Sequence, residues 1–306
     1  MNVEKVENWL KANQERLGID FKQVYPVDSG ESNHNFVIES DEKKVLRVTK
    51  TISRKSRLEN EAEKLEFLAD QGIEGVPEKI FFEKETELGE VLIESFVGTE
   101  KVDKNNLNEE RIRSLATKIA EIHSIPVESY RNFSGSQEGK ERSLKQIFKE
   151  DFVKWSERPY KEYRELSENV DERIEYFFGK QKELLKEIPD AKVKQGLCHG
   201  DLGFNIRATE NEVFIIDWEF SRISHPGIEI IYCFEHEKLD NKQRKIFLEE
   251  YRKTRDTGNH FEFLRKVYPK FLAFNDMIWA AKRIEEGEDK KQLLEDRIKE
   301  LEEYYR

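Results

Sequence analysis

The sequence predicts an α+β chain with a small N-terminal part built on an antiparallel sheet and a larger, mainly helical part. Up to about residue 95, short β-branched and aromatic runs are separated by turn residues, which is typical of antiparallel strands. From residue 108 onward, apolar residues recur at helical spacing. A chain of 306 residues suits one bilobal unit or two domains. We therefore expect two lobes, residues 1–95 and residues 96–306.

The N-terminal lobe begins with an amphipathic helix over residues 3–17, which Gly18 can end as a C-cap. Three antiparallel strands follow within residues 21–50, where the pattern changes to short β-branched and aromatic runs. Residues 57–72 return to helical spacing, and residues 77–97 read as two more strands joined by the turn "TELG".

The second lobe opens with a strong amphipathic helix over residues 108–125, for which Asn108 is the candidate N-cap. Residues 131–190 predict two or more helices. Residues 194–221 interrupt them with two short strands around the turn "TEN", and the chain is then helical to its end.

Composition and charge exclude several classes of protein. The net charge is −11 and the sequence pI is about 5.4, which argues against nucleic-acid binding through overall electrostatics. Cys198 and Cys233 do not form a disulfide framework or a Cys-x-x-Cys pair, so we expect reduced core thiols and no zinc site. The charged N-terminus and the lack of a long apolar run predict a cytoplasmic protein without a membrane span.

The stretch "LCHGDLGFN", residues 197–205, carries the clearest chemistry. Asp201 lies in a short loop, where a carboxylate can accept a proton from a substrate hydroxyl. Asn205 follows it, and the apolar run 213–216 then ends on Asp217, so amide and carboxylate oxygens lie a hairpin apart. Mg²⁺ prefers such hard oxygen ligands, and a carboxylate that ends a buried strand needs a partner or a metal.

Three earlier features are weaker when taken singly. The turn 28–33, "DSGESN", can bring backbone N–H groups close to a phosphate, but a plain hairpin explains it equally well. Arg47 can point inward to a phosphate or outward to solvent. The next helix offers Glu59, Glu61 and Glu63 as partners for that cation, although most carboxylates on so charged a helix face water.

Taken in this order, these residues resemble the aminoglycoside phosphotransferase and choline kinase group, which shares the bilobal fold of protein kinases. The resemblance runs from about Val24 to about Tyr232, and "HGD…N…IDWE" is its most specific part. It implies an ATP-dependent, Mg²⁺-dependent kinase in which Asp201 is the catalytic base or hydroxyl-orienting residue. By the same resemblance, Asn205 and Asp217 would hold Mg²⁺.

The resemblance also implies a nucleotide site in the N-terminal lobe. Arg47 would stand where most such kinases have a lysine, and Glu61 would be its helix partner. The nucleotide phosphates would be covered by the turn that contains Ser29, Gly30, Ser32 and Asn33. The adenine hinge would include Glu94 and Phe96. His123 would be structural.

The chain departs from the family pattern at three places. Three residues separate Asp201 from Asn205, where the family usually has four. Glu229 stands where relatives often carry an aspartate that braces the catalytic loop. The phosphate turn contains Gly30 as its single glycine.

The acceptor is predicted less sharply than the phosphate donor. Residues 130–190 combine acids with Trp155, Tyr160, Tyr163 and Tyr176, a composition that suits a cationic amine but also ordinary helix surface and core. We expect a small-molecule kinase that phosphorylates a hydroxyl of a metabolite or amino sugar. A choline- or ethanolamine-type kinase is the alternative within this class, and a nucleotide-binding pseudokinase is the alternative outside it.

Overall fold

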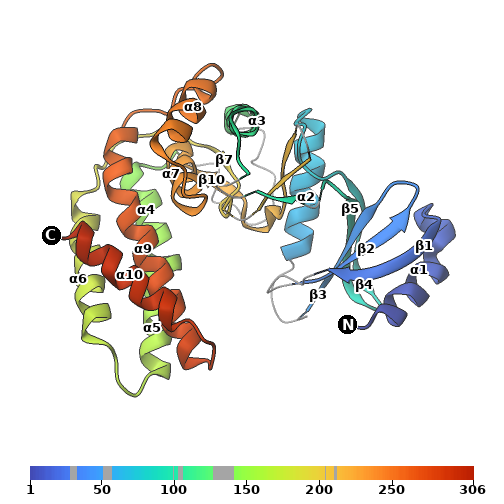
Figure 1. Cartoon of the computed structure of the whole chain (residues 1–306), viewed down its shortest axis with the longest axis horizontal. Helices are drawn as coiled ribbons and strands as arrows, with labels where there is room; N and C mark the ends of the chain where they lie inside the picture. Colours follow the sequence, from blue (N-terminus) through green and yellow to red (C-terminus); the bar gives the residue numbers. More distant parts are fainter. Residues whose placement is uncertain are drawn as a thin grey trace. The chain divides into compact units, whose positions relative to one another are not determined.

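The computed structural model describes residues 1–27, 33–50, 57–98, 100–102, 106–126, 141–203, 205–209 and 212–306. The chain forms two compact units, each assembled from three segments of the sequence. Unit 1 contains residues 1–138, 199–222 and 239–255, and unit 2 contains residues 139–198, 223–238 and 256–306. Figure 1 labels the helices and strands of both units.

A five-stranded antiparallel sheet in the order β1-β2-β3-β5-β4 dominates the N-terminal part of unit 1. Its strands are β1 (Phe21–Val27), β2 (Asn33–Ser40), β3 (Lys44–Thr49), β4 (Lys79–Thr86) and β5 (Gly89–Ser95). Pro26 lies in β1, an edge strand, where the missing N–H of a proline breaks no central ladder.

Helix α1 (Val3–Leu17) covers one face of this sheet (Figure 1). Asn2 caps its start by accepting a hydrogen bond from the N–H of Lys5, and Gly18 ends it in the left-handed region at φ 64°. Its buried residues join a single apolar cluster with alternate residues of the strands, among them Leu46 and Val48. Because side chains alternate along a strand, the residues between these point to the opposite face of the sheet.

Helix α2 (Arg57–Asp70) lies against that opposite face. The rest of unit 1 combines the residues that follow β5 with two segments from later in the chain. A three-stranded sheet in the order β6-β8-β9 is built from Glu100–Lys101, Ile206–Ala208 and Val213–Ile215. It is joined by α3 (Glu109–Ser124), the 3-10 turn η4 (Trp218–Phe220) and α8 (Asn241–Tyr251). Asn108 caps α3 as expected, because its side chain accepts from the N–H of Arg111.

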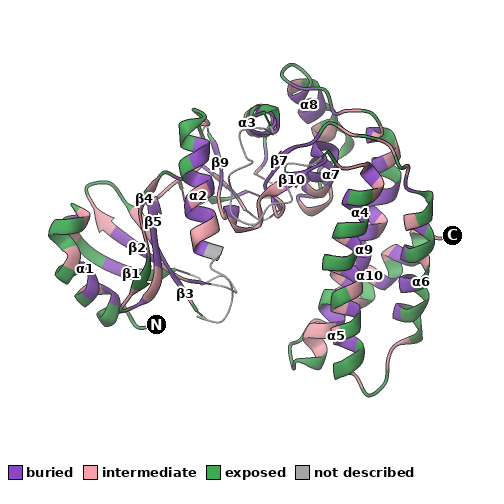
Figure 2. Ribbon diagram, turned by 180° about the vertical axis from the view of Figure 1, so that it is seen from behind, coloured by how far each residue is buried: buried purple, intermediate pink, exposed green. Residues whose placement is uncertain are grey.

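Unit 2 is mainly helical. Its helices are α4 (Leu144–Phe152), α5 (Arg158–Leu166), α6 (Glu172–Glu187), α7 (Pro226–His236), α9 (Phe261–Glu285) and α10 (Lys291–Tyr304). A two-stranded sheet pairs β7 (Gly196–Cys198) with β10 (Arg222–Ser224). Figure 2 shows buried residues running along α9, which packs against α5, α6, α7 and α10.

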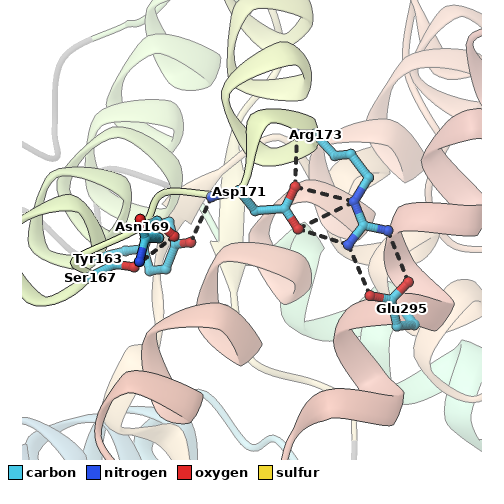
Figure 3. Close-up of polar contacts among 6 residues, drawn as sticks. All are labelled: Tyr163, Ser167, Asn169, Asp171, Arg173 and Glu295. Carbon is cyan, nitrogen blue, oxygen red and sulfur yellow. Dashed lines mark hydrogen bonds and ion pairs between the residues drawn. The ribbon is translucent and has the colours of Figure 1, made fainter.

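Two local features of unit 2 follow from its sequence. A π-helical turn (Val153–Glu157) separates α4 from α5 just before Pro159, whose missing N–H interrupts the regular ladder. At the start of α6, Arg173 hydrogen-bonds the carboxylates of Asp171 and Glu295 and so joins α6 to α10 (Figure 3).

The observed elements confirm the predicted α+β fold class, with an antiparallel sheet and helix first and mainly helices afterwards. The division at residue 95 stays a prediction. Cys198 and Cys233 are both buried and free. Among the described residues, no helix is long and apolar enough to cross a membrane.

Candidate active site

Arg47 occupies the α2-facing side of the sheet because its strand neighbours Leu46 and Val48 point into the α1 core. Its side chain is 8% exposed and forms a close ion pair with Glu61 of α2. The predicted pairing of Arg47 with Glu61 is therefore present, and the outward, solvated arginine considered from the sequence is not.

Two further carboxylates meet the same guanidinium. Arg47 Nη2 donates to Asp217 Oδ1 at 3.0 Å, although 170 residues separate the two in the sequence. Glu94 Oε1 lies 3.9 Å from Arg47 Nη1. One cation thus faces three acids, all within unit 1.

Glu61 connects this cluster to the segment that follows Asp217. The carboxylate of Glu61 is fully buried, and its Oε1 accepts a hydrogen bond of 3.1 Å from the backbone N–H of Trp218. The Trp218 indole donates to the carbonyl of Ile215 at 2.9 Å, which fixes the turn after β9. This role of Trp218 was not predicted, and the "IDW" sequence gives no signal of it beyond the presence of a large apolar residue.

Asp217 has a left-handed backbone, at φ 67°, which is costly for a residue other than glycine. The preceding residue, Ile216, donates its N–H to the carbonyl of Asn205 at 2.9 Å. The hairpin of β8 and β9 therefore brings Asn205 and Asp217 close together, as the sequence predicted. The strained backbone is a second reason to look for function at Asp217.

The loop between β7 and β8 is closed by its own polar groups. Asn205 Nδ2 donates to the carbonyl of Asp201 at 2.7 Å, and its backbone N–H donates to the carbonyl of Leu202 at 3.2 Å. These bonds form even though only three residues separate Asp201 from Asn205. Phe204, one of the three, lies outside the described residues.

His199 and Gly200 fix the start of this loop. His199 Nε2 bonds the carbonyl of Ile216 at 2.8 Å, which assigns the proton to Nε2 and leaves Nδ1 to accept from the N–H of Asp201 at 3.3 Å. Gly200 has φ +84°, and a Cβ there would lie 2.4 Å from the carbonyl oxygen of Phe220. The "HGD" sequence is therefore explained by an orienting histidine, an obligatory glycine and the acid that they present.

Burial and charge act together on the cluster. Burial lowers the pKa of Arg47, but the fields of Glu61, Asp217 and Glu94 raise it more, so the guanidinium stays charged. Burial raises the pKa of Glu94 to about 7, an effect that Arg47 opposes and Asp217 reinforces. Burial also raises the pKa of Glu61 well above its usual value, against the field of Arg47. Because the neighbouring acids disfavour each other's charged forms around a single cation, the cluster favours an additional cation.

The donor set at Asn205 and Asp217 fits Mg²⁺. The Asn205 amide uses its nitrogen on the Asp201 carbonyl, which turns Oδ1 to the other side. The Asp217 side chain is 33% exposed and bonds Arg47 through Oδ1. Two hard oxygen ligands on adjacent segments match the preference of Mg²⁺, which usually keeps several waters.

The turn that was predicted to cover the nucleotide phosphates lies mostly outside the described residues. Ser29, Gly30 and Ser32 lie outside the described residues. Asn33 begins β2 opposite Thr49 and is 4% exposed. By strand alternation it lies on the same face of the sheet as Arg47.

The predicted adenine hinge contains a side chain whose direction the sequence did not indicate. The N–H groups of Ser95 and Phe96 donate to the carbonyls of Glu78 and Lys43, at 2.9 and 3.2 Å. The Glu94 side chain turns to Arg47. The available signal was strand alternation: in β5, Val91 and Ile93 join the α1 core, so Glu94 faces the other way.

Two other residues named from the sequence, His123 and Glu229, are both buried. His123 is fully buried in α3 and its Nδ1 lies 3.0 Å from the Tyr251 hydroxyl, in keeping with a structural part. Glu229 is buried in the first turn of α7, and its proposed bracing of the catalytic loop stays a prediction.

Two of the aromatic residues expected near an acceptor, Trp155 and Tyr176, already form cation–π contacts with lysine side chains of this chain. Lys154 lies 4.5 Å from the centroid of the Trp155 ring, and Lys180 lies 5.6 Å from that of Tyr176. Tyr160 and Tyr163 are buried. These contacts leave the nature of the acceptor open.

Comparison with known proteins places this site in context. The sequence model of the phosphotransferase enzyme family matches residues 23–264. The chain is 24% identical, over 118 residues, to a curated LicA homolog from Mycoplasma capricolum; the match covers 34% of this chain and about half, 48%, of that relative.

Solved structures share the fold over nearly the whole chain. The choline kinase LicA from Streptococcus pneumoniae has a TM-score of 0.67 at 17% identity, covering 98% of each chain. A choline kinase from Cryptosporidium parvum has a TM-score of 0.71 at 17% identity, covering 99% of this chain and 95% of that one. A spectinomycin phosphotransferase in complex with ADP and spectinomycin has a TM-score of 0.66 at 14% identity, covering 97% of this chain and 93% of that one.

Proposed function

Because the chain belongs to the phosphotransferase enzyme family, we propose that it transfers the γ-phosphate of ATP to a hydroxyl group of a small molecule. The observation that carries the proposal is the cluster in unit 1 that joins Arg47, Glu61 and Asp217, with Asn205 beside Asp217. It combines a fixed cation for phosphate oxygens with two oxygen ligands for a metal. Asp201 begins the loop that Asn205 closes.

Each residue has a distinct part in the proposed reaction. Arg47 would bind phosphate oxygens, while Asn205 and Asp217 would hold Mg²⁺. When bound, Mg²⁺ neutralises charge on the phosphate oxygens during transfer. The turn with Ser29, Gly30, Ser32 and Asn33 covers the nucleotide phosphates, and the backbone around Glu94 and Phe96 binds the adenine. The lobe of residues 1–95 thus binds the nucleotide, and the lobe of residues 96–306 supplies catalysis and the acceptor site.

Asp201 orients the acceptor hydroxyl and receives its proton. The O–H bond of the acceptor breaks, a new bond forms between its oxygen and the γ-phosphorus, and the bond to the bridging oxygen breaks with its electron pair leaving on ADP. Positioning and charge stabilisation supply most of the rate enhancement in such transfers. The main contribution of the protein is therefore to position the acceptor hydroxyl, Asp201 and the γ-phosphate relative to one another.

The acceptor class has two candidates. A choline- or ethanolamine-type kinase is favoured by the names of two structural relatives, which are choline kinases. A sugar or amino sugar is the other candidate, and the name of a third structural relative, a spectinomycin phosphotransferase, supports an acceptor other than choline. Nucleic acid is not expected as a partner, because the net charge is −11.

An acceptor screen tests the proposal. The protein is incubated with MgATP and a pooled panel of choline, ethanolamine, sugars and aminoglycosides, and ADP release and phosphorylated products are followed by mass spectrometry. A product of plus one phosphate supports the proposal and names the acceptor class. Tight nucleotide binding without transfer to any acceptor would favour the pseudokinase, and the absence of nucleotide binding would overturn the proposal.

A further inference from the structure

Glu94 lies on the same face of the sheet as Arg47. In the ladder between β3 and β5, Arg47 is opposite Leu92 and Val45 is opposite Glu94. Positions 92 and 94 share a face because side chains alternate along a strand. Glu94 is therefore the diagonal cross-strand neighbour of Arg47, a separation that long side chains bridge.

The carboxyl group of Glu94 is buried and only partly bonded. The residue is 5% exposed, and Oε1 lies 3.9 Å from Arg47 Nη1. Within the part of the chain that the structure describes, Oε2 is buried and has no hydrogen-bond partner. Burying a carboxyl with an unsatisfied oxygen is costly, so a leucine like its neighbour Leu92 would be the more stable choice for this strand.

The arginine explains the presence of the acid. A guanidinium is a planar fork with two nitrogen ends, and here Nη1 meets Glu61 while Nη2 meets Asp217. Glu94 is a third carboxylate, on the Nη1 side, and it comes from the strand β5 and not from α2. Carboxylates from α2 and β5 therefore flank one end of the fork, while Asp217 meets the other end.

We propose that Glu94 is a positioning residue for Arg47, holding the guanidinium against β5 so that its Nη2 end stays directed to Asp217 and to the nucleotide phosphates. The inference rests on the proposed function, because it assigns the phosphates as the target of Arg47. It gives the side chain of Glu94 a part that is separate from the adenine hinge formed by the backbone of this strand.

The protonation state of the Glu94 carboxyl determines which substitutions preserve its positioning role. With a pKa of about 7, Glu94 is partly protonated at neutral pH, so an amide of the same shape removes less than one full charge. Glu94→Gln keeps an oxygen for Arg47. Glu94→Met fills the volume without an acceptor, and Glu94→Leu is a second apolar variant that guards against a folding defect in the first.

A double-mutant cycle with MgATP tests the proposal by calorimetry. We expect Glu94→Met and Glu94→Leu to weaken MgATP binding about tenfold, because the apolar side chains remove one partner of a buried charge contact. We expect Glu94→Gln to weaken it about twofold to threefold, because the amide keeps an oxygen near Arg47. In an Arg47→Lys background, where a single ammonium replaces the fork, the apolar variants should add less than about twofold. Glu83→Gln, at an exposed ion pair with Arg16, is the matched control and should bind as the wild type does.

Three outcomes separate the hypotheses. The same loss in both backgrounds means that Glu94 only supports the strand, and it overturns the proposal. Unchanged affinity in both apolar variants, with melting curves that confirm folding, also overturns it. If the wild type binds neither MgATP nor MgGTP, the proposed function itself has failed, and this result is distinct from the other two.

Discussion

Two arginines of this chain each lie between carboxylates, and they differ most in their exposure to water. The side chain of Arg47 in unit 1 is 8% exposed, whereas that of Arg173 in unit 2 is 44% exposed (Figure 3). At Arg173, water competes for every ion pair, so the network adds little to stability. At Arg47, the buried acids and the buried cation stabilise each other's charged forms. Because three acids face one cation, the proposed function adds the positive charge of a metal to this cluster. Arginine and carboxylate side chains therefore form an ordinary surface contact in unit 2 and a candidate active site in unit 1.

The largest expected effect is on turnover, and it tests whether unit 1 contains the catalytic base. We expect Asp201→Asn to lower turnover about 10³-fold, because the amide cannot accept the hydroxyl proton, while nucleotide affinity changes little. Steady-state rates with the acceptor found by screening measure the effect. Asp41→Asn, at a side chain that is 99% exposed, is the matched control and should keep the wild-type rate. Intact turnover in Asp201→Asn would remove the base assignment.

The second prediction concerns the stability that the buried Arg47 contributes, which a later variant of Arg173 allows to be compared. Arg47→Met leaves buried carboxylates without their cation and should lower the free energy of unfolding by about 3 kcal/mol, measured by urea denaturation. A loss below about 1 kcal/mol would mean that burial does not strengthen this cluster as proposed.

The third prediction concerns pH and follows from Glu94, whose pKa rises from 4.5 to about 7 on folding. Between these two values the unfolded chain has lost the proton that the folded chain keeps, so this group makes unfolding easier as the pH rises. Its contribution should fall by on the order of 2 kcal/mol from pH 4.5 to pH 7. Urea denaturation across this range should show Glu94→Gln gaining stability relative to the wild type as the pH rises. Parallel profiles would contradict the assigned environment of Glu94.

The smallest effect is expected in unit 2. Arg173→Met should lower the free energy of unfolding by less than about 1 kcal/mol, and the difference should shrink further in 1 M salt, where exposed ion pairs are screened. A loss as large as that of Arg47→Met would erase the distinction between the two regions.

Much of the fold could be predicted from the sequence, because local patterns set it. The alternating runs of the sheet, the cap at Asn108 and the left-handed end of α1 at Gly18 are all short-range signals. The π-helical turn was not predicted, although Pro159 is a local signal for an irregular ladder. The strand β10 was not predicted because it pairs with β7, a segment distant in the sequence.

The sequence predicted which residues form the candidate site better than it predicted the contacts among them. The family resemblance predicted Glu61 as the partner of Arg47, and the structure contains this ion pair. The ion pair between Arg47 and Asp217 was not predicted. The hydrogen bond from Trp218 to Glu61 and the approach of Glu94 to Arg47 were not predicted. Both depend on how a helix and a strand pack in three dimensions, which residue spacing alone does not determine.

The central claim is that the buried cluster of unit 1 binds a metal–nucleotide complex through Asp217. Calorimetric titration of ATP with and without Mg²⁺, into the wild type and Asp217→Ala, tests it most directly. We expect the wild type to bind ATP more tightly when Mg²⁺ is present, and the variant to lose this dependence. Equal Mg²⁺-dependent affinity in the two proteins would contradict the account.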